Sequence, residues 1–182
     1  MQLIHAVLGL LLVVLGLLIA LMVIDEPAFS TGAAHGLYAG MNVGGDGLAR
    51  LGGATWLIGW LGATSMLLMV LLSAFGVRAE RRSGVFWVLI VIAAAGAEFV
   101  WWSMYLEYLA FLRTGDANFV LSFPAATSWM LYGVWLSGAV LALIYIFGFR
   151  HFVFTHADEA AYEALRADAE TPRLPPEQHK TH

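Results

Sequence analysis

Four long apolar stretches dominate the sequence and limit what the chain can fold into. They cover residues of about 3–24, 53–77, 85–112 and 124–149. Each is long enough to cross a hydrocarbon core about 30 Å thick as a helix, which takes roughly 20 residues. Lipid offers the backbone no hydrogen bonds, so each span must be helical. The sequence therefore predicts an all-α integral membrane protein, with a four-transmembrane-helix bundle in residues 1–154.

The overall composition supports this prediction. Of the 182 residues, 60% are hydrophobic and only 12% are charged. A water-soluble domain of this size needs more polar surface to cover its core. The first span has no Lys or Arg before it and no cleavage site of small residues after it, so we expect a retained helix and not a signal peptide.

The distribution of positive charge predicts the membrane topology of the chain. Arg78, Arg81 and Arg82 lie between the second and third spans, and Arg150 follows the fourth. Lys and Arg are enriched in cytoplasmic loops. We therefore expect a multi-pass membrane protein with the N and C termini cytoplasmic.

The two longest segments outside the spans differ in character. Residues 155–182 are mainly acidic, and we expect a cytoplasmic tail with a short surface helix that starts near Thr155 or Asp158, followed by a disordered, proline-rich end. Its charge argues against binding to nucleic acid. Residues 25–52 are rich in glycine, and we expect a flexible loop on the membrane surface or against a neighbour, with a re-entrant segment as the alternative.

Glu98 is the residue in the predicted spans whose transfer into lipid is the least favourable. It lies near the middle of the third span, where an ionisable side chain is unfavourable and marks a candidate functional site. Three hydroxyls at similar depth can satisfy its oxygens, those of Thr64, Ser65 and Ser137. These four residues form the candidate intramembrane polar site. A hydrogen-bonded structural carboxyl, a proton or cation site, and an acid that pairs with another subunit all remain open.

A second set of residues is a candidate contact surface for a partner or for lipid. Aromatic side chains are more numerous than the membrane interfaces require, and small residues allow helices to approach closely. The candidates are Trp101, Trp102, Tyr105, Gly133, Ser137 and Arg150. Glu107 is expected at the membrane boundary, where its carboxylate can reach the headgroups.

Several kinds of chemistry are disfavoured by the residues that the chain has. It contains no cysteine, which excludes disulfides and thiolate metal sites. None of its histidines lies deep within a predicted span, since His5 is at the very start of the first, which argues against a haem held between two imidazoles. Since no nucleophile–base pair or metal cluster is evident, we expect no enzyme activity, no cofactor and no metal site.

The final span carries a further pattern. Pro124 suits the first turn of a helix, with Ser122 as its cap. Residues 121–165 resemble the last helix of small membrane subunits that accompany bacterial sodium/solute symporters. The residues that carry this resemblance are Phe123, Pro124, Trp129, Tyr145 and Phe149. The resemblance covers about a quarter of the chain, and those families commonly have two or three spans where four are predicted here.

Together these patterns favour a non-catalytic accessory subunit of a bacterial inner-membrane complex. The resemblance implies a secondary transporter of the sodium/solute type. Its expected partners are a larger integral membrane subunit and phospholipids, and not nucleic acid. Two alternatives remain: an accessory subunit of a respiratory or photosynthetic electron-transfer complex that binds lipid, quinone or pigment, and a small oligomeric transporter or channel that uses Glu98.

Overall fold

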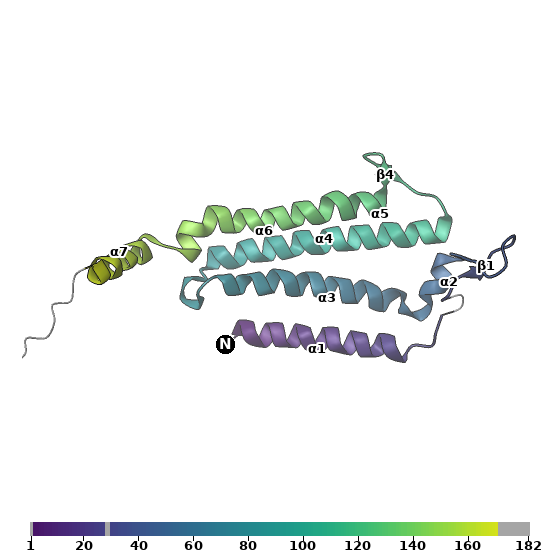
Figure 1. The fold of residues 1–182 in the computed structure, drawn as a ribbon, viewed down its shortest axis with the longest axis horizontal. Helices are drawn as coiled ribbons and strands as arrows, with labels where there is room; N and C mark the ends of the chain where they lie inside the picture. The colour runs from purple at the N-terminus through teal and green to yellow at the C-terminus, as the bar shows by residue number, and fades with distance from the viewer. Residues whose placement is uncertain (1, 28–29, 171–182) are drawn as a thin grey trace, which may run out of the picture.

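A computed structural model describes residues 2–27 and 30–170, and almost all of its regular structure is helical (Figure 1). Four helical segments are long and apolar enough to cross a membrane: Gln2–Val23, Gly47–Gly76, Gly84–Thr114 and Ala125–Val153. The predicted helical class and the four predicted long apolar helices are therefore confirmed. The four segments are compatible with a membrane location. Which side each end faces stays a prediction.

Two of the four segments are single α-helices and two are composite. The first and third are α1 (Gln2–Val23) and α4 (Gly84–Thr114), and η3 (Ala79–Arg81) precedes α4. The second consists of α2 (Gly47–Leu51), η1 (Gly52–Ala54), α3 (Thr55–Ser73) and η2 (Ala74–Gly76). The fourth consists of α5 (Ala125–Ser128), a π-helical turn η4 (Trp129–Gly133), α6 (Val134–Gly148) and a second π-helical turn η5 (Phe149–Val153).

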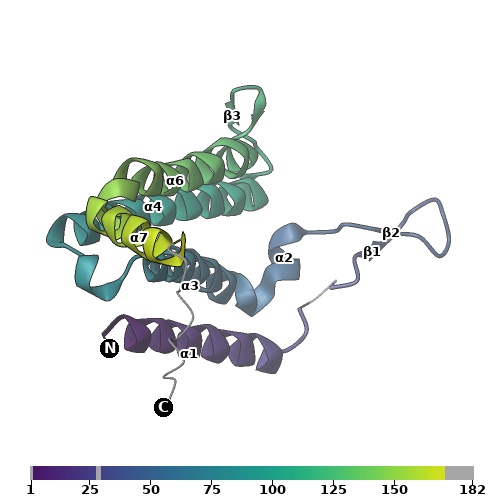
Figure 2. The ribbon, with the colours of Figure 1, turned by 60° about the vertical axis from the view of Figure 1, so that its left-hand side comes forward.

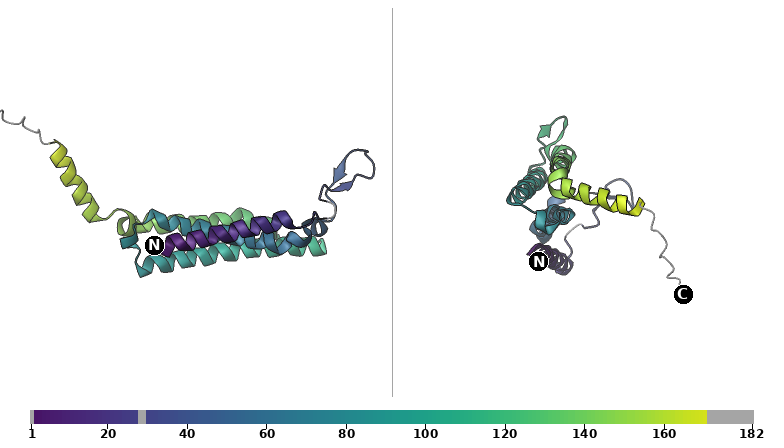
Figure 3. Two further views of the ribbon diagram at one scale, coloured as in Figure 1. Left: turned by 90° about the horizontal axis from the view of Figure 1, so that it is seen from below. Right: turned by 90° about the vertical axis from the view of Figure 1, so that its left-hand side faces the viewer.

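The long helices pack in chain order, with α1 on α3, α3 on α4, and α4 on α6 (Figures 1 and 2). Neighbouring helices run in opposite directions, so the start of α1 and the end of α6 lie at the same end of the molecule (Figures 1 and 3). In the first and fourth segments only 6% of an 18-residue apolar stretch is buried, against 28% in the second and third. The two inner helices therefore supply most of the packing, and the outer two leave most of their surface uncovered.

A core of large apolar side chains lies at the end of the molecule where α1 begins. Phe86, Ile90 and Val77 are almost completely buried there. The ring of Phe86 packs edge-on against Phe152 at 5.3 Å between centroids, which joins α4 to η5. Leu3 and Val7 bring the first turns of α1 into the same cluster. In a lipid environment, with which these four helices are compatible, such a core is stabilised by close packing and not by exclusion from water.

The glycine-rich segment 25–52 is more regular than a flexible loop. Strands β1 (Ala33–Ala34) and β2 (Asn42–Val43) form a short antiparallel hairpin that projects beyond the end of the helices (Figure 1). Asp46 then caps α2 by accepting hydrogen bonds from the N–H groups of Leu48 and Ala49. Gly32 has a φ of 88°, and a Cβ there would overlap the carbonyl oxygen of Val43. This close approach allows the hairpin to close and explains one of the glycines.

The predicted cap of the fourth span is wrong. Ser122 lies in the tight turn between β3 (Phe119–Val120) and β4 (Phe123–Pro124), where its φ is 69°. Pro124 occupies the N-cap position itself, and no side chain caps α5. The hairpin carries Ser122 away from the helix start. The Ser128 hydroxyl, from inside α5, instead donates a hydrogen bond of 2.5 Å to the carbonyl of Val120.

The tail begins with a helix, α7 (His156–Glu170), as expected near Thr155 and Asp158. It continues past the end of the row of helices and projects away from it (Figures 1 and 3). The predicted disorder of the proline-rich end falls on residues 171–182, which lie outside the described residues.

Candidate functional site

Glu98 lies midway along α4 and is half-buried. Its Oε1 atom is enclosed by the protein and makes no hydrogen bond within the described residues. The indole of Trp102, one helical turn further along, is the polar neighbour of the carboxyl. Glu98 therefore lies midway along a long apolar helix, with one buried oxygen that has no hydrogen-bond partner within the described residues.

The three hydroxyls expected to satisfy Glu98 bond within their own helices. Thr64 donates to the carbonyl of Trp60 at 2.8 Å, and Ser65 donates to the carbonyl of Leu61 at 2.7 Å. Ser137 donates to the carbonyl of Val134 at 2.8 Å. Ser and Thr hydroxyls in apolar helices commonly donate to a carbonyl of the preceding turn in this way. The predicted hydrogen bonds to Glu98 do not form, because each hydroxyl proton already has an acceptor in its own helix.

The aromatic face of α4 packs against α3 of the same chain. The indole N–H of Trp101 donates to the carbonyl of Gly59 at 2.9 Å, and the Tyr105 hydroxyl donates to the carbonyl of Thr55. Only 4% of Tyr105 is exposed. Tyr105 is therefore too buried to contact a partner or lipid as predicted, whereas Trp101 is partly exposed and its contact with a partner or lipid stays a prediction. Trp102 lies edge-on to Trp60, also in α3, at 5.1 Å.

Two glycines of α3 receive these rings. A Cβ on Gly59 would lie 2.8 Å from the Tyr105 ring, and a Cβ on Gly62 would overlap the ring of Trp101. Small residues allow helices to approach this closely, but the sequence does not show which rings fill the space. Gly9 in α1 differs, because no atom lies within 4 Å of where its Cβ would be.

The small residues of the fourth span are also partly used within the chain. Gly133 is buried, and a Cβ there would lie 2.8 Å from Val100 of α4. Gly133 therefore packs against α4. It is not free to receive a partner, which differs from the prediction that it contacts a partner or lipid. Ser137 lies beside it in a groove between α4 and α6. On another side of α6, no atom lies within 4 Å of the Cβ position of Gly138.

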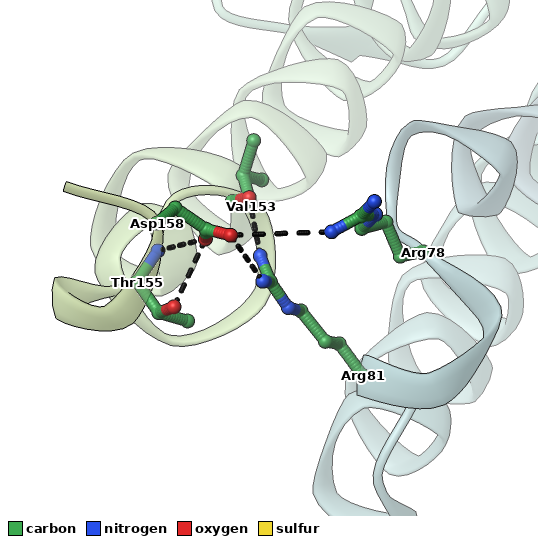
Figure 4. Close-up of polar contacts among 5 residues, drawn as sticks. All are labelled: Arg78, Arg81, Val153, Thr155 and Asp158. Carbon is green, nitrogen blue, oxygen red and sulfur yellow. Dashed lines mark hydrogen bonds and ion pairs between the residues drawn. The ribbon is translucent and has the colours of Figure 1, made fainter. Parts of the chain in front are cut away.

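The connection to α7 is a cluster of charged groups that the sequence did not indicate (Figure 4). Arg81 donates from Nη1 to the carbonyl of Val153 at 2.9 Å and from Nη2 to the Asp158 carboxylate at 2.6 Å. The backbone N–H and hydroxyl of Thr155 donate to the other oxygen of Asp158 at 2.8 and 2.9 Å. Arg78 is more distant, at 3.9 Å from Asp158. We call Arg81, Val153, Thr155 and Asp158 the α7 clasp.

Arg150, a predicted partner or lipid contact, supports the same junction. Its Nη1 donates to Glu159 at 2.7 Å, and about half of its side chain remains exposed. The hydrogen bond from Arg150 lowers the pKa of Glu159. Likewise, the hydrogen bond from Arg81 holds the pKa of Asp158 well below its usual range, and the two Thr155 donors act in the same direction. Both carboxylates at the start of α7 are therefore charged at neutral pH.

The lowered pKa of Asp158 predicts how α7 responds to acid. A carboxylate whose pKa is lower in the folded protein contributes stability above its ordinary pKa of 3.8, and this stability is lost as the pH falls below that value. We expect α7 to stay docked from pH 8 to pH 5 and to loosen progressively below 3.8. The measurement is the distance between spin labels on cysteines introduced in α7 and in the first turn of α4. Asp158→Asn removes the titrating group, so an unchanged acid transition in that variant would contradict the assignment.

Within the described residues, no group of three His, Asp or Glu side chains is placed to hold a metal ion. His179 and His182 lie outside these residues. Comparisons with models of known protein families, with curated proteins and with solved structures found no match.

Proposed function

We propose that this chain is a non-catalytic subunit of a bacterial inner-membrane complex, held beside a larger integral membrane protein with both termini in the cytoplasm. The observation that carries the proposal is Glu98. A carboxyl at mid-membrane costs a few kcal/mol on insertion scales, and Oε1 has no hydrogen bond within the described residues. The nearest expected hydroxyls bond elsewhere. Because Glu98 as a whole is only half-buried, a rotation of its carboxyl group would bring this oxygen to a polar group on a neighbouring helix of the larger protein.

The helical phase of α4 supports a position at the edge of the α3 contact. Trp101 and Tyr105 point towards α3, and Glu98 lies on the same side but further round the helix. Further round the helix in that direction come Val91, then Trp102, which packs on Trp60 of α3, and then Val88. The two valines are 63% and 58% exposed. A partner helix placed over these valines would reach the carboxyl and cover apolar surface at the same time.

The class of the larger protein rests on the resemblance of residues 121–165. It favours a secondary transporter of the sodium/solute type over an electron-transfer complex. In the structure, Tyr145 from this segment donates a hydrogen bond to the carbonyl of Ser73 in α3. The residues of the resemblance thus include one whose hydrogen bond joins the fourth span to the second. This bond would hold the two spans of the subunit together.

Replacement of Glu98 tests the proposal. We expect Glu98→Leu to reduce the fraction of the chain in a high-mass complex about 3- to 20-fold, because a hydrogen bond between membrane helices contributes roughly 0.6–1.7 kcal/mol. Glu98→Gln keeps a hydrogen-bonding side chain and should have a smaller effect. The measurement is native gel electrophoresis of chains extracted from their own membrane in mild detergent, with mass spectrometry of the co-migrating protein.

Glu107→Gln is the matched control, because Glu107 lies on the same helix but near its end, within 3.5 Å of the Asn118 side chain. It should leave the complex intact. If all three variants behave like the wild type, Glu98 does not hold a partner. If the purified chain alone transports a solute into liposomes, the protein is a transporter and not a subunit of one.

A further inference from the structure

Two apolar grooves lie along the fourth segment on the side that faces α4. The first, of about 560 Å³, lies at the α7 end and is lined by Leu89, Val140, Leu143, Ile144, Phe147, Gly148, His151 and Phe152. The second, of about 350 Å³, continues towards Trp129 and Phe99. Val140 lines both grooves, so together they form one seam, which we call the α4–α6 seam.

The length of the first groove matches one leaflet of a membrane. From Val140 to Phe152 the helix rises about 18 Å at roughly 1.5 Å per residue. Half of a hydrocarbon core is about 15 Å thick. Val140 lies near the middle of the segment Ala125–Val153, at the expected depth of the membrane centre. The groove therefore begins at the membrane centre and ends at the surface, which is the path of a single acyl chain.

A pair of opposite charges, Arg150 and Glu159, lies at the turn η5 where this groove ends, although neither residue lines the groove itself. His151 lines it, and Arg150 precedes His151 in the turn η5. Arg150 uses Nη1 for Glu159, which leaves other N–H donors of its guanidinium for an anion. Glu159 remains 40% exposed beside it. A headgroup with a phosphate and an ammonium fits this pair, the phosphate against Arg150 and the ammonium against Glu159.

We propose that the α4–α6 seam binds one molecule of phosphatidylethanolamine, with an acyl chain in the groove at the α7 end and the headgroup at Arg150 and Glu159. A phospholipid held here fills a gap that the side chains of α4 and α6 leave open. It also supports η5, the turn on which α7 and its clasp depend. This site is separate from Glu98, which lies on the α3 side of α4.

The test is lipid retention by the full chain. Protein purified in dodecyl maltoside is stripped of loosely bound lipid, given palmitoyl-oleoyl phosphatidylethanolamine or phosphatidylglycerol, and analysed by native mass spectrometry. Wild type should keep one phosphatidylethanolamine, and Leu143→Trp, which fills the groove, should lower that retention at least fivefold. Ile146→Trp is the matched control: Ile146 lies on the same helix, is 65% exposed and lines neither groove, so retention should stay at the wild-type level.

Three results would overturn the proposal. One is equal loss of lipid in the two tryptophan variants, which would make the groove irrelevant. Another is stronger retention of phosphatidylglycerol than of phosphatidylethanolamine, which would contradict the paired headgroup contacts. The third is the absence of any retained lipid in the wild type, as expected if a helix of a partner protein fills the seam in the complex.

Discussion

Gly62→Ala should strongly destabilise the protein, although it adds a single methyl group. In an ordinary helix position this change is favourable by about 1 kcal/mol. Here the new Cβ would overlap the ring of Trp101, so the ring must move and its hydrogen bond to the Gly59 carbonyl must weaken. Overpacking of this kind costs about 1–3 kcal/mol. We expect a loss of that size in the free energy of unfolding, measured by titration with SDS in mixed micelles.

Gly138→Ala provides the matched control, because no atom lies within 4 Å of the position of its Cβ. It should be neutral or slightly stabilising. A second variant tests the cause: Trp101→Leu, combined with Gly62→Ala, removes the ring that the methyl group displaces. The combined variant should lose less stability than the two single changes added together. If Gly62→Ala were as stable as Gly138→Ala, the rings of α4 would not pack into α3 as described.

Arg81→Ala should release α7 from the row of helices, whereas Arg78→Ala should leave it in place. Arg81 is 20% exposed and bonds both the Val153 carbonyl and the Asp158 carboxylate. Arg78 is 69% exposed and lies 3.9 Å from the same carboxylate, where an ion pair contributes little. The two variants remove the same positive charge from neighbouring turns. A difference between them therefore reports the bonds of Arg81 and not the overall charge.

The chain contains no cysteine, so labels can be placed without removing native residues. Spin labels on Ala164→Cys in α7 and Val85→Cys in α4 should give one narrow distance distribution in the wild type. Arg81→Ala should broaden it severalfold, and Arg78→Ala should not. Equal broadening in both variants would mean that charge alone, without the specific bonds of the clasp, holds α7.

The outline of the fold could be predicted because it depends on local composition. Runs of apolar residues about as long as a membrane is thick must be helical, whatever they contact. The same reasoning marked Glu98, since its cost depends on depth and depth follows from its place in the span. The start of α7 near Asp158 was also predictable, because a side chain that caps a helix acts within a few residues.

The candidate site was less predictable, because the sequence shows which face of a helix a residue lies on but not what that face touches. Trp101 and Tyr105 suited a partner as well as a neighbouring helix, and Gly59 and Gly62 opposite them decided between the two. Thr64 and Ser65 lay at the right depth for Glu98, but their own helices offered closer acceptors. Nothing in the sequence beyond its charge indicated a role for Arg81, because its partner Asp158 is 77 residues away in the chain.

The sequence by itself therefore determined the helical class, the four apolar spans and a costly acid at mid-depth. These follow from the transfer of each side chain and peptide group into lipid, which depends on the local chain alone. The tertiary structure decided which rings fill which glycine spaces, which arginine holds α7, and that one oxygen of Glu98 finds no bond among the residues that the structure describes. These are matters of distance between segments far apart in the chain, and they depend on how the four helices pack together.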